Sequence, residues 1–143
     1  AAWLAFGGRE TLQSYGVDLP AREDDWEALT LASDQLLDRL PLDHLAFFEQ
    51  LELSVAYGDY LFVHAGIRPG LPLERQMEED MLWIRRLFLA SRADHGKVVV
   101  HGHTTGRRPA VRRNRIAIDT AAYRSGKLTC LVLAGEERRF LST

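Results

Sequence analysis

Apolar residues recur at helical spacing through the first third of the chain, with polar residues at the positions between them. This pattern predicts helices at residues 1–6, 9–15, 33–40 and 43–51. The Gly7-Gly8 pair separates the first two helices, Ser33 is a candidate N-cap of the third, and Pro41 is expected to end it. Each predicted helix has one apolar face.

After residue 51 the pattern changes to short apolar runs that turn residues separate, and such runs predict strands. The expected strands are residues 53–57, 60–64, 97–101, 115–119, 127–133 and 137–141. Gly58-Asp59, between the first two runs, indicates a tight hairpin. Residues 77–90 are the exception, because Met81, Ile84 and Phe88 recur on one side of a helix. The whole pattern predicts an α/β fold with helices packed outside a sheet.

Two of the predicted strands end in the same way. The apolar run at residues 61–63 leads into His64-Ala65-Gly66, and the run at residues 98–100 leads into His101-Gly102-His103. Such runs are typical of strands buried on both faces, and ligands of α/β sheets bind just beyond the carboxyl ends of these strands. We therefore expect His64 and His103 at one edge of the sheet, where two neutral imidazoles are suitable ligands for zinc, iron or manganese.

The simpler alternative is that each histidine is a solvated or hydrogen-bonded residue at a strand end. Gly102 is expected to begin a turn, so we assign His101 a supporting or structural role. His44, on a predicted surface helix, and His95, in a polar turn, are expected to have no functional role.

The composition fits a globular domain, since the chain has 143 residues, of which 46% are hydrophobic and 27% charged. With 18 basic and 20 acidic residues the formal net charge is -2, which argues against a bulk positive field that would attract a nucleic acid or an anionic membrane. No apolar run approaches the roughly 20 residues that span a bilayer. We therefore expect no nucleic-acid partner and no membrane association.

Cys130 is the only cysteine, so we expect no internal disulfide and no metal site with several thiolates. A reducing compartment is the better match, and we predict a cytoplasmic protein whose metal ligands are histidines or carboxylates. The sequence begins Ala1-Ala2-Trp3, with neither a methionine nor a charged leader before an apolar stretch. We therefore expect no signal peptide, and residue 1 is not an obvious natural start.

Four segments together resemble a known family. They read YLFVHAGIRPG at residues 60–70, DMLWIRR at 80–86, VVVHGHT at 98–104 and RIAIDTAAYRSGKLTCLVL at 115–133. In order and spacing they are similar to the C-terminal half of bacterial calcineurin-like metallophosphoesterases, in the serine/threonine protein phosphatase-like branch that includes dinucleoside tetraphosphatases. Residues 3–18 are similar to the region after the family's Gly-Asn-His-Glu motif. The resemblance implies the C-terminal half of an α/β/β/α sandwich with a mixed sheet.

The resemblance also implies a site. In that family two divalent metal ions, Mn, Fe or Zn, bind the phosphate and activate a water for in-line attack. His64 and His103 correspond to ligands of one of these metals. Arg85, two residues after Trp83, corresponds to the arginine that contacts the phosphoryl group, and its planar guanidinium suits phosphate oxygens. Without the resemblance, Arg85 would be interpreted as part of a solvated helix face.

Asp119 follows the apolar residues 116–118 and belongs to a motif usually written Ile-Asp-Thr-Gly-Ala. We suggest that its carboxylate orients a metal-bound imidazole, as ligating histidines commonly require, and a plain turn cap or a role for Thr120 is the alternative. The sequence departs from the family at Ala121, where glycine is usual, and at Thr105, where proline usually follows Gly-His-Thr. If the glycine position needs a positive φ, Ala121 costs about 1 kcal/mol or shifts the backbone.

The family's Asp-x-His, Gly-Asp-x-x-Asp-Arg-Gly and Gly-Asn-His-Glu motifs, which supply the other metal ligands and the general acid, do not occur in the sequence. Residues 1–143 are therefore expected to form a single domain or the C-terminal portion of a larger metallophosphoesterase domain. The general acid is unassigned, and the isolated portion is expected to be inactive.

Three hypotheses about function follow. The first is a metal-dependent phosphoester hydrolase that acts on a phosphorylated protein, a small phosphoester or a dinucleoside polyphosphate. The second is a non-catalytic binding or scaffolding module with the same fold, and the third is an unrelated histidine metalloprotein. A half sandwich with an unpaired sheet edge would also favour a homodimer.

Overall fold

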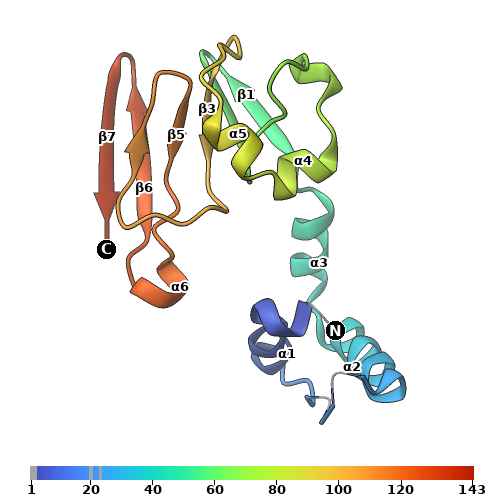
Figure 1. Ribbon diagram of the computed structural model, residues 1–143. Helices are drawn as coiled ribbons and strands as arrows, with labels where there is room; N and C mark the ends of the chain where they lie inside the picture. Colours follow the sequence, from blue (N-terminus) through green and yellow to red (C-terminus); the bar gives the residue numbers. More distant parts are fainter. Residues whose placement is uncertain (1–2, 20, 23) are drawn as a thin grey trace. The chain divides into compact units, whose positions relative to one another are not determined.

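A computed structural model of the chain describes residues 3–19, 21–22 and 24–143. The chain divides into two compact units, Ala1–Leu51 and Glu52–Thr143 (Figure 1). The description below takes each unit by itself, and the organisation of residues 1–143 as a single domain stays a prediction. No helix in the described parts of the chain has both the length and the apolar character that a membrane span requires.

The first unit consists of helices. The segment η1 (Leu4–Gly8), whose backbone is non-helical at Phe6 and Gly7, leads into α1 (Arg9–Ser14). Two further helices follow, α2 (Trp26–Arg39) and α3 (Leu42–Glu49). Its buried core consists of Leu4, Leu12, Val17 and Ala32. The predicted helices 9–15 and 43–51 are confirmed as α1 and α3, whereas residues 1 and 2 of the first predicted helix lie outside the described residues.

The start of α2 differs from the sequence prediction. The helix begins at Trp26, where the side chain of Asp25 accepts a hydrogen bond of 3.1 Å from the backbone N–H of Ala28. Asp25 is therefore the N-cap, and Ser33 lies inside the helix. The end was predicted correctly, since the helix stops at Arg39, before the extended Leu40 and Pro41.

The second unit contains a five-stranded sheet with the order β1-β2-β3-β5-β4 (Figure 1). Its strands are β1 (Ser54–Tyr57), β2 (Tyr60–Val63), β3 (Val98–His101), β4 (Ala110–Val111) and β5 (Arg115–Ala117). Strands β2, β3 and β5 run parallel, while β1 and β4 pair antiparallel at the two edges. The predicted α/β fold with a mixed sheet is therefore confirmed.

The hairpin between β1 and β2 turns at Gly58, whose φ of 54° lies in the left-handed region that favours glycine. Two further strands, β6 (Thr129–Ala134) and β7 (Glu137–Ser142), form a separate antiparallel pair. Arg138 of β7 places its guanidinium over the ring of Tyr60 and donates a hydrogen bond of 2.9 Å to its hydroxyl. Strand β4 and the short helix α6 (Ala122–Ser125) were not predicted.

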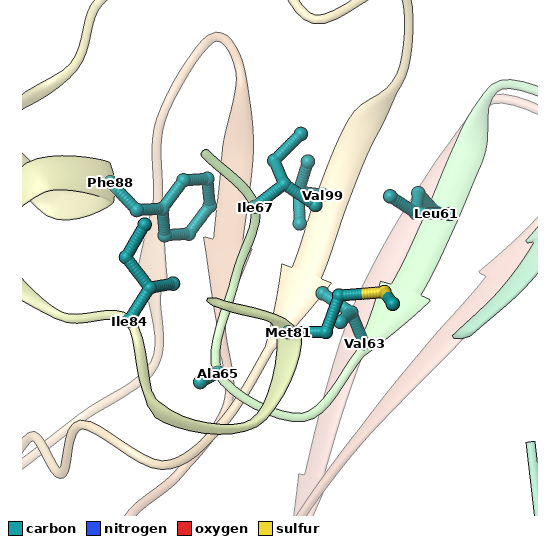
Figure 2. Close-up of a cluster of buried hydrophobic side chains, with 8 residues drawn as sticks. All are labelled: Leu61, Val63, Ala65, Ile67, Met81, Ile84, Phe88 and Val99. Atoms are coloured by element: carbon teal, nitrogen blue, oxygen red, sulfur yellow. The ribbon is translucent and has the colours of Figure 1, made fainter. Parts of the chain in front are cut away.

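One face of the five-stranded sheet is covered by two short helices, α4 (Glu78–Trp83) and α5 (Arg86–Ala90). Figure 2 shows the apolar cluster between them and the sheet, to which β2 and β3 contribute Leu61, Val63 and Val99. The helical side adds Met81, Ile84 and Phe88, and the segment after β2 adds Ala65 and Ile67. Full burial of a large apolar side chain contributes about 1.5–3 kcal/mol to folding, so this cluster holds both helices against the sheet.

The predicted continuous helix at residues 77–90 is wrong, although its three core residues are all buried as expected. The carbonyl of Met81, which would accept a hydrogen bond from the N–H of Arg85 in an unbroken helix, accepts one of 2.8 Å from the N–H of Ala65. The chain extends at Ile84, and Arg85 has φ −129° and ψ −96°. A bond to a distant segment therefore divides one apolar helix pattern into two helices.

The loop between β2 and α4 includes the 3-10 turn η2 (Leu73–Arg75) and is closed at its base by Arg68 and Asp80. The guanidinium of Arg68 donates two hydrogen bonds to the carboxylate of Asp80, at 2.7 and 2.8 Å. Gln76 adds further bonds, since its side chain accepts from the N–H of Arg68 and donates to the carbonyls of Arg68 and Leu71.

Candidate functional site

The carboxyl ends of β2, β3 and β5 meet at one edge of the sheet, as parallel strands require. His64 follows β2, His103 follows β3 after a single glycine, and Asp119 follows β5. Two backbone bonds join these turns, because Gly102 donates to the carbonyl of His64 at 2.8 Å and Ile118 donates to that of His101 at 3.0 Å. The structure thus brings together the two histidines that the sequence pattern singled out.

The two imidazoles face each other. His64 Nε2 lies 3.1 Å from His103 Nδ1, and the ring centroids are 4.9 Å apart. This is a hydrogen-bond distance when one of the two nitrogen atoms carries a hydrogen, so the pair also fits the simpler alternative of hydrogen-bonded histidines at strand ends. With metal–nitrogen bonds of about 2.0–2.1 Å, this separation corresponds to an angle of about 100° at a shared metal ion. Such an angle suits adjacent ligands in tetrahedral or octahedral coordination, so the two nitrogen atoms fit one divalent metal.

Other ligands are not grouped with this pair. Within residues 3–19, 21–22 and 24–143, no three histidine, cysteine, aspartate or glutamate side chains are placed together so that they could hold a metal ion. Catalytic metal sites usually have at least three protein ligands. His64 and His103 therefore form part of a possible site rather than a complete one.

The surroundings of His103 favour its neutral form. Partial burial lowers the pKa of this imidazole, and the positive charge of Arg85 and the neighbouring His64 lower it further. A neutral ring is the form that binds a metal. His103 Nε2 is buried and has no hydrogen-bond partner in the described structure, and the residue has a φ of 61°.

Arg85 lies beside this pair because of the break between α4 and α5. Its guanidinium approaches the backbone carbonyl of His103 at 3.4 Å, which is long for a hydrogen bond and leaves most of its N–H groups available. Arg85 is exposed, so an anionic group in solution has access to it. Trp83, on the other side of Ile84, places its ring edge-on to His103 with centroids 5.6 Å apart.

Asp119 makes a local contact. Its Oδ1 accepts a hydrogen bond of 2.9 Å from the N–H of Ala121, which is the geometry of a turn cap. No hydrogen bond joins its carboxylate to either imidazole among the bonds of the described residues, and its charge acts weakly against the fall in the pKa of His103. The suggested role of Asp119 in orienting a metal-bound imidazole stays a prediction.

His101 is a core residue of the second unit, with 1% of its surface exposed. Its Nδ1 lies 3.1 Å from the carbonyl of Gly102, and because a carbonyl only accepts, Nδ1 carries the hydrogen. Burial lowers the pKa of the ring, whose edge packs against Phe88 with centroids 5.1 Å apart. The ring is therefore neutral near pH 7, and its buried Nε2 carries an unused lone pair.

The remaining histidines make structural contacts. His44 Nδ1 lies 2.9 Å from the hydroxyl of Tyr15 within the first unit. His95 is tilted against the ring of Phe88, with centroids 5.9 Å apart, and burial lowers its pKa.

Trp83 was missed as a site residue at the level of sequence, and the contact that requires a glycine at position 66 was not identified there. Trp83 served only as a landmark for Arg85, yet its ring contacts His103. Gly66 has a φ of 154°, and a Cβ at this position would come within 2.3 Å of Phe88 Cδ1. A glycine two residues after a strand-end histidine was the available signal, but the contact partner lies 22 positions away and cannot be identified from local pattern.

Comparison with known proteins shows the fold. No protein-family model matches the sequence, and no curated protein matches it either. A solved structure described as "Crystal structure of a putative diadenosine tetraphosphatase" matches with a TM-score of 0.63 and 18% sequence identity. The match covers 94% of this chain and 64% of that chain, so the present sequence spans less than two thirds of that structure. The shared α/β architecture confirms the predicted fold class.

Proposed function

We propose that this chain forms part of the active site of a metal-dependent phosphoester hydrolase. The observation that carries the proposal is the 3.1 Å separation of His64 Nε2 and His103 Nδ1, with the guanidinium of Arg85 beside them. Two imidazoles at this distance suit a divalent metal, and an exposed arginine next to a metal suits a phosphate oxygen.

Each residue has a defined task in this proposal. His64 and His103 hold the metal through the nitrogen atoms that face each other, and the lowered pKa of His103 keeps its ring in the binding form. When bound, a divalent metal supplies a polarising charge and a water of lowered pKa. Arg85 binds and orients the phosphoryl group through its free N–H donors, and Trp83 shields one side of His103.

The remaining ligands and the general acid are proposed to come from residues outside this sequence. Two histidines are fewer than the three protein ligands of a usual catalytic site, and the matching structure is longer than the part that this chain covers. The description of that structure as a putative diadenosine tetraphosphatase supports a dinucleoside polyphosphate as one substrate, and small phosphoesters and phosphorylated proteins are the further candidates.

The test is hydrolysis of p-nitrophenyl phosphate by the complete protein that contains this sequence, after removal of metal ions and addition of manganese, zinc or ferrous iron in turn. His64→Ala is expected to abolish the metal-dependent rate, because one of the two adjacent ligands is lost. His44→Ala removes an imidazole that contacts Tyr15 and serves as the control with unchanged activity. Full activity in His64→Ala, or equal losses in both variants, would contradict the proposal.

A second candidate function is a non-catalytic module that binds phosphate-bearing molecules. The absence of a third ligand near the two histidines, within the residues that the structure describes, favours it. Binding of a non-hydrolysable phosphate analogue without turnover under any of the metals would support this candidate over the hydrolase.

A further inference from the structure

One segment of the chain contains six of the 18 basic residues and no acidic residue. Residues 96–118 contain Lys97 and five arginines, at positions 107, 108, 112, 113 and 115, and no aspartate or glutamate. The formal net charge of -2 for the whole chain conceals this local excess. The expectation of no nucleic-acid partner and no membrane association rested on that average, whereas the field at a surface depends on how the charges are distributed.

Adjoining cavities surround this segment. A cavity of about 270 Å³ is lined by Arg107 together with Arg124 and Lys127. It shares Thr105 and Gly106 with a second cavity of about 190 Å³, which lies along the edge strand β4. No carboxylate lines the first cavity, so its charge is positive.

The second cavity adjoins a third. Arg108, Arg112 and Arg115 line the second, and the latter two also line the third, which has a volume of about 620 Å³. Arg92 and Arg113 complete the cationic lining of the third cavity, which also contains no carboxylate. The three cavities therefore adjoin one another through shared lining residues around β4 and the start of β5, and we call them together the basic groove.

Part of the positive charge of the groove is already compensated within the protein. Arg115 donates hydrogen bonds to the carbonyls of Leu89 and Ser91 and to Asn114 Oδ1. Arg92 and Arg113 also line a neighbouring cavity together with Asp59 and Asp94.

Asp119 is the one carboxylate among the residues that line the three cavities, and its Oδ1 already accepts from Ala121. The ion pairs found among the described residues, Arg22–Asp24 and Arg68–Asp80, lie outside the groove. Burial lowers the pKa of Arg115, and the neighbouring positive charge of Arg112 lowers it further. An anion in the groove would relieve this repulsion.

We propose that the groove around β4 is a binding site for an oligophosphate chain, either inorganic or attached to a nucleoside. Arginine binds phosphate oxygens through two parallel N–H donors, and several arginines along the basic groove suit a ligand with several phosphates in a row. His64 and His103 line none of the three cavities, although the second cavity reaches Thr104 and Asp119 at the same edge of the sheet.

The groove favours a phosphate chain over a single-stranded nucleic acid. Proteins that bind single strands combine a basic groove with aromatic side chains on which the bases stack. The residues that line the three cavities include no phenylalanine, tyrosine or tryptophan. The groove therefore offers contacts for phosphates and lacks the usual platforms for bases.

The experiment measures the binding of inorganic tripolyphosphate to the metal-free protein by calorimetry, at 50 mM and 200 mM NaCl. The double variant Arg112→Ala/Arg113→Ala removes two charges from the groove, and Arg75→Ala/Arg139→Ala removes two exposed charges from elsewhere. The groove variant is expected to bind tripolyphosphate about tenfold or more weakly, because charge-assisted hydrogen bonds are lost with each arginine. The control variant is expected to change the affinity by less than about twofold. Raising the salt concentration weakens binding in the unaltered protein.

Further arms identify the ligand and keep this proposal apart from the proposed function. ATP that binds as tightly as tripolyphosphate indicates that the phosphate chain alone is recognised, and tighter binding of ATP indicates a nucleoside polyphosphate. His64→Ala retains the binding of tripolyphosphate if the groove is the site, whether or not the hydrolase proposal holds. The proposal is overturned if tripolyphosphate fails to bind, if both double variants weaken binding equally, if His64→Ala abolishes binding, or if a single-stranded oligonucleotide binds more tightly than tripolyphosphate.

Discussion

The guanidinium of Arg85 lies against the backbone carbonyl of His103, 18 positions further along the chain. The break between α4 and α5 produces this contact, since Arg85 stands between the two helices rather than on a helix face. Under the proposed function, the pair joins a candidate phosphate-binding group to a candidate metal ligand.

Replacement of Arg85 should therefore affect catalysis more than stability. Under the proposed function, Arg85→Ala is expected to lower kcat/KM for p-nitrophenyl phosphate by about 100-fold, because a donor to the developing phosphoryl charge is lost. Arg86→Ala, at the neighbouring exposed position, should retain activity within about threefold. Steady-state kinetics with both variants measure this difference. A similar loss of kcat/KM in the two variants would contradict a role of Arg85 in binding the phosphoryl group.

The departure from the family pattern at Ala121 leads to a stability prediction. Ala121 has φ 56° and ψ 49°, a left-handed conformation that glycine adopts without strain. Ala121→Gly is expected to stabilise the protein by about 0.5–1 kcal/mol. The substitution relieves the backbone strain of the folded state, and the greater conformational freedom of glycine in the unfolded chain offsets part of this gain. Urea unfolding measures the change. Ala122 is the first residue of α6, so Ala122→Gly should destabilise the protein. A change in the free energy of unfolding of the same sign in both variants would contradict the prediction.

Gly66 is the position where an added methyl group should do the most damage. A Cβ at this residue would lie 2.3 Å from Phe88 Cδ1, and Phe88 is fully buried in the core. Gly66→Ala is expected to destabilise the protein by about 2–3 kcal/mol through overpacking. Gly70 also has a positive φ, but a Cβ added there would meet no atom within 4 Å. Gly70→Ala is therefore the control, and it should lower the free energy of unfolding by about 1 kcal/mol. Thermal unfolding of both distinguishes a steric clash from backbone strain alone.

Stability should fall in mild acid because of His101. Burial lowers the pKa of this ring in the folded protein, so the unfolded chain takes up its proton at a higher pH than the folded chain does. The free energy of unfolding is therefore largest above the ordinary histidine pKa of about 6.5, and it decreases as the pH falls toward the lowered pKa of the folded state.

The variant His101→Asn keeps an N–H donor for the carbonyl of Gly102 but does not titrate. Urea unfolding at pH 7.5 and pH 5.5 is expected to show a smaller loss of stability in this variant than in the unaltered protein. An identical loss would show that His101 does not contribute to the pH dependence.

Local pattern was sufficient for the features that depend on neighbouring residues in the sequence. The apolar runs before His64 and His103 predicted two strands, and the rule that parallel strands end at one edge placed the two rings together. Gly58-Asp59 similarly predicted the hairpin of β1 and β2. These signals required no information about contacts between distant parts of the chain.

The features that were missed depend on such contacts. Met81, Ile84 and Phe88 have the spacing of one continuous helix, and only the hydrogen bond from Ala65 to the carbonyl of Met81 divides it. The two-residue strand β4 is too short to carry a period, and its partner β5 defines it. Aspartate is a common N-cap residue, so Asp25 could have been predicted as the N-cap of α2 from its residue type. It was missed because the helix that follows is largely polar and shows little apolar periodicity before residue 33.

The Arg68–Asp80 pair has a consequence for how this protein tolerates change in length. Because the two side chains fasten the ends of the loop between β2 and α4, the residues between them do not set the distance from His64 to Arg85. Insertions, deletions or a chain cut near Gly70 and Leu71 would be absorbed inside the loop. This segment is therefore suited to carry a tag or a reporter domain.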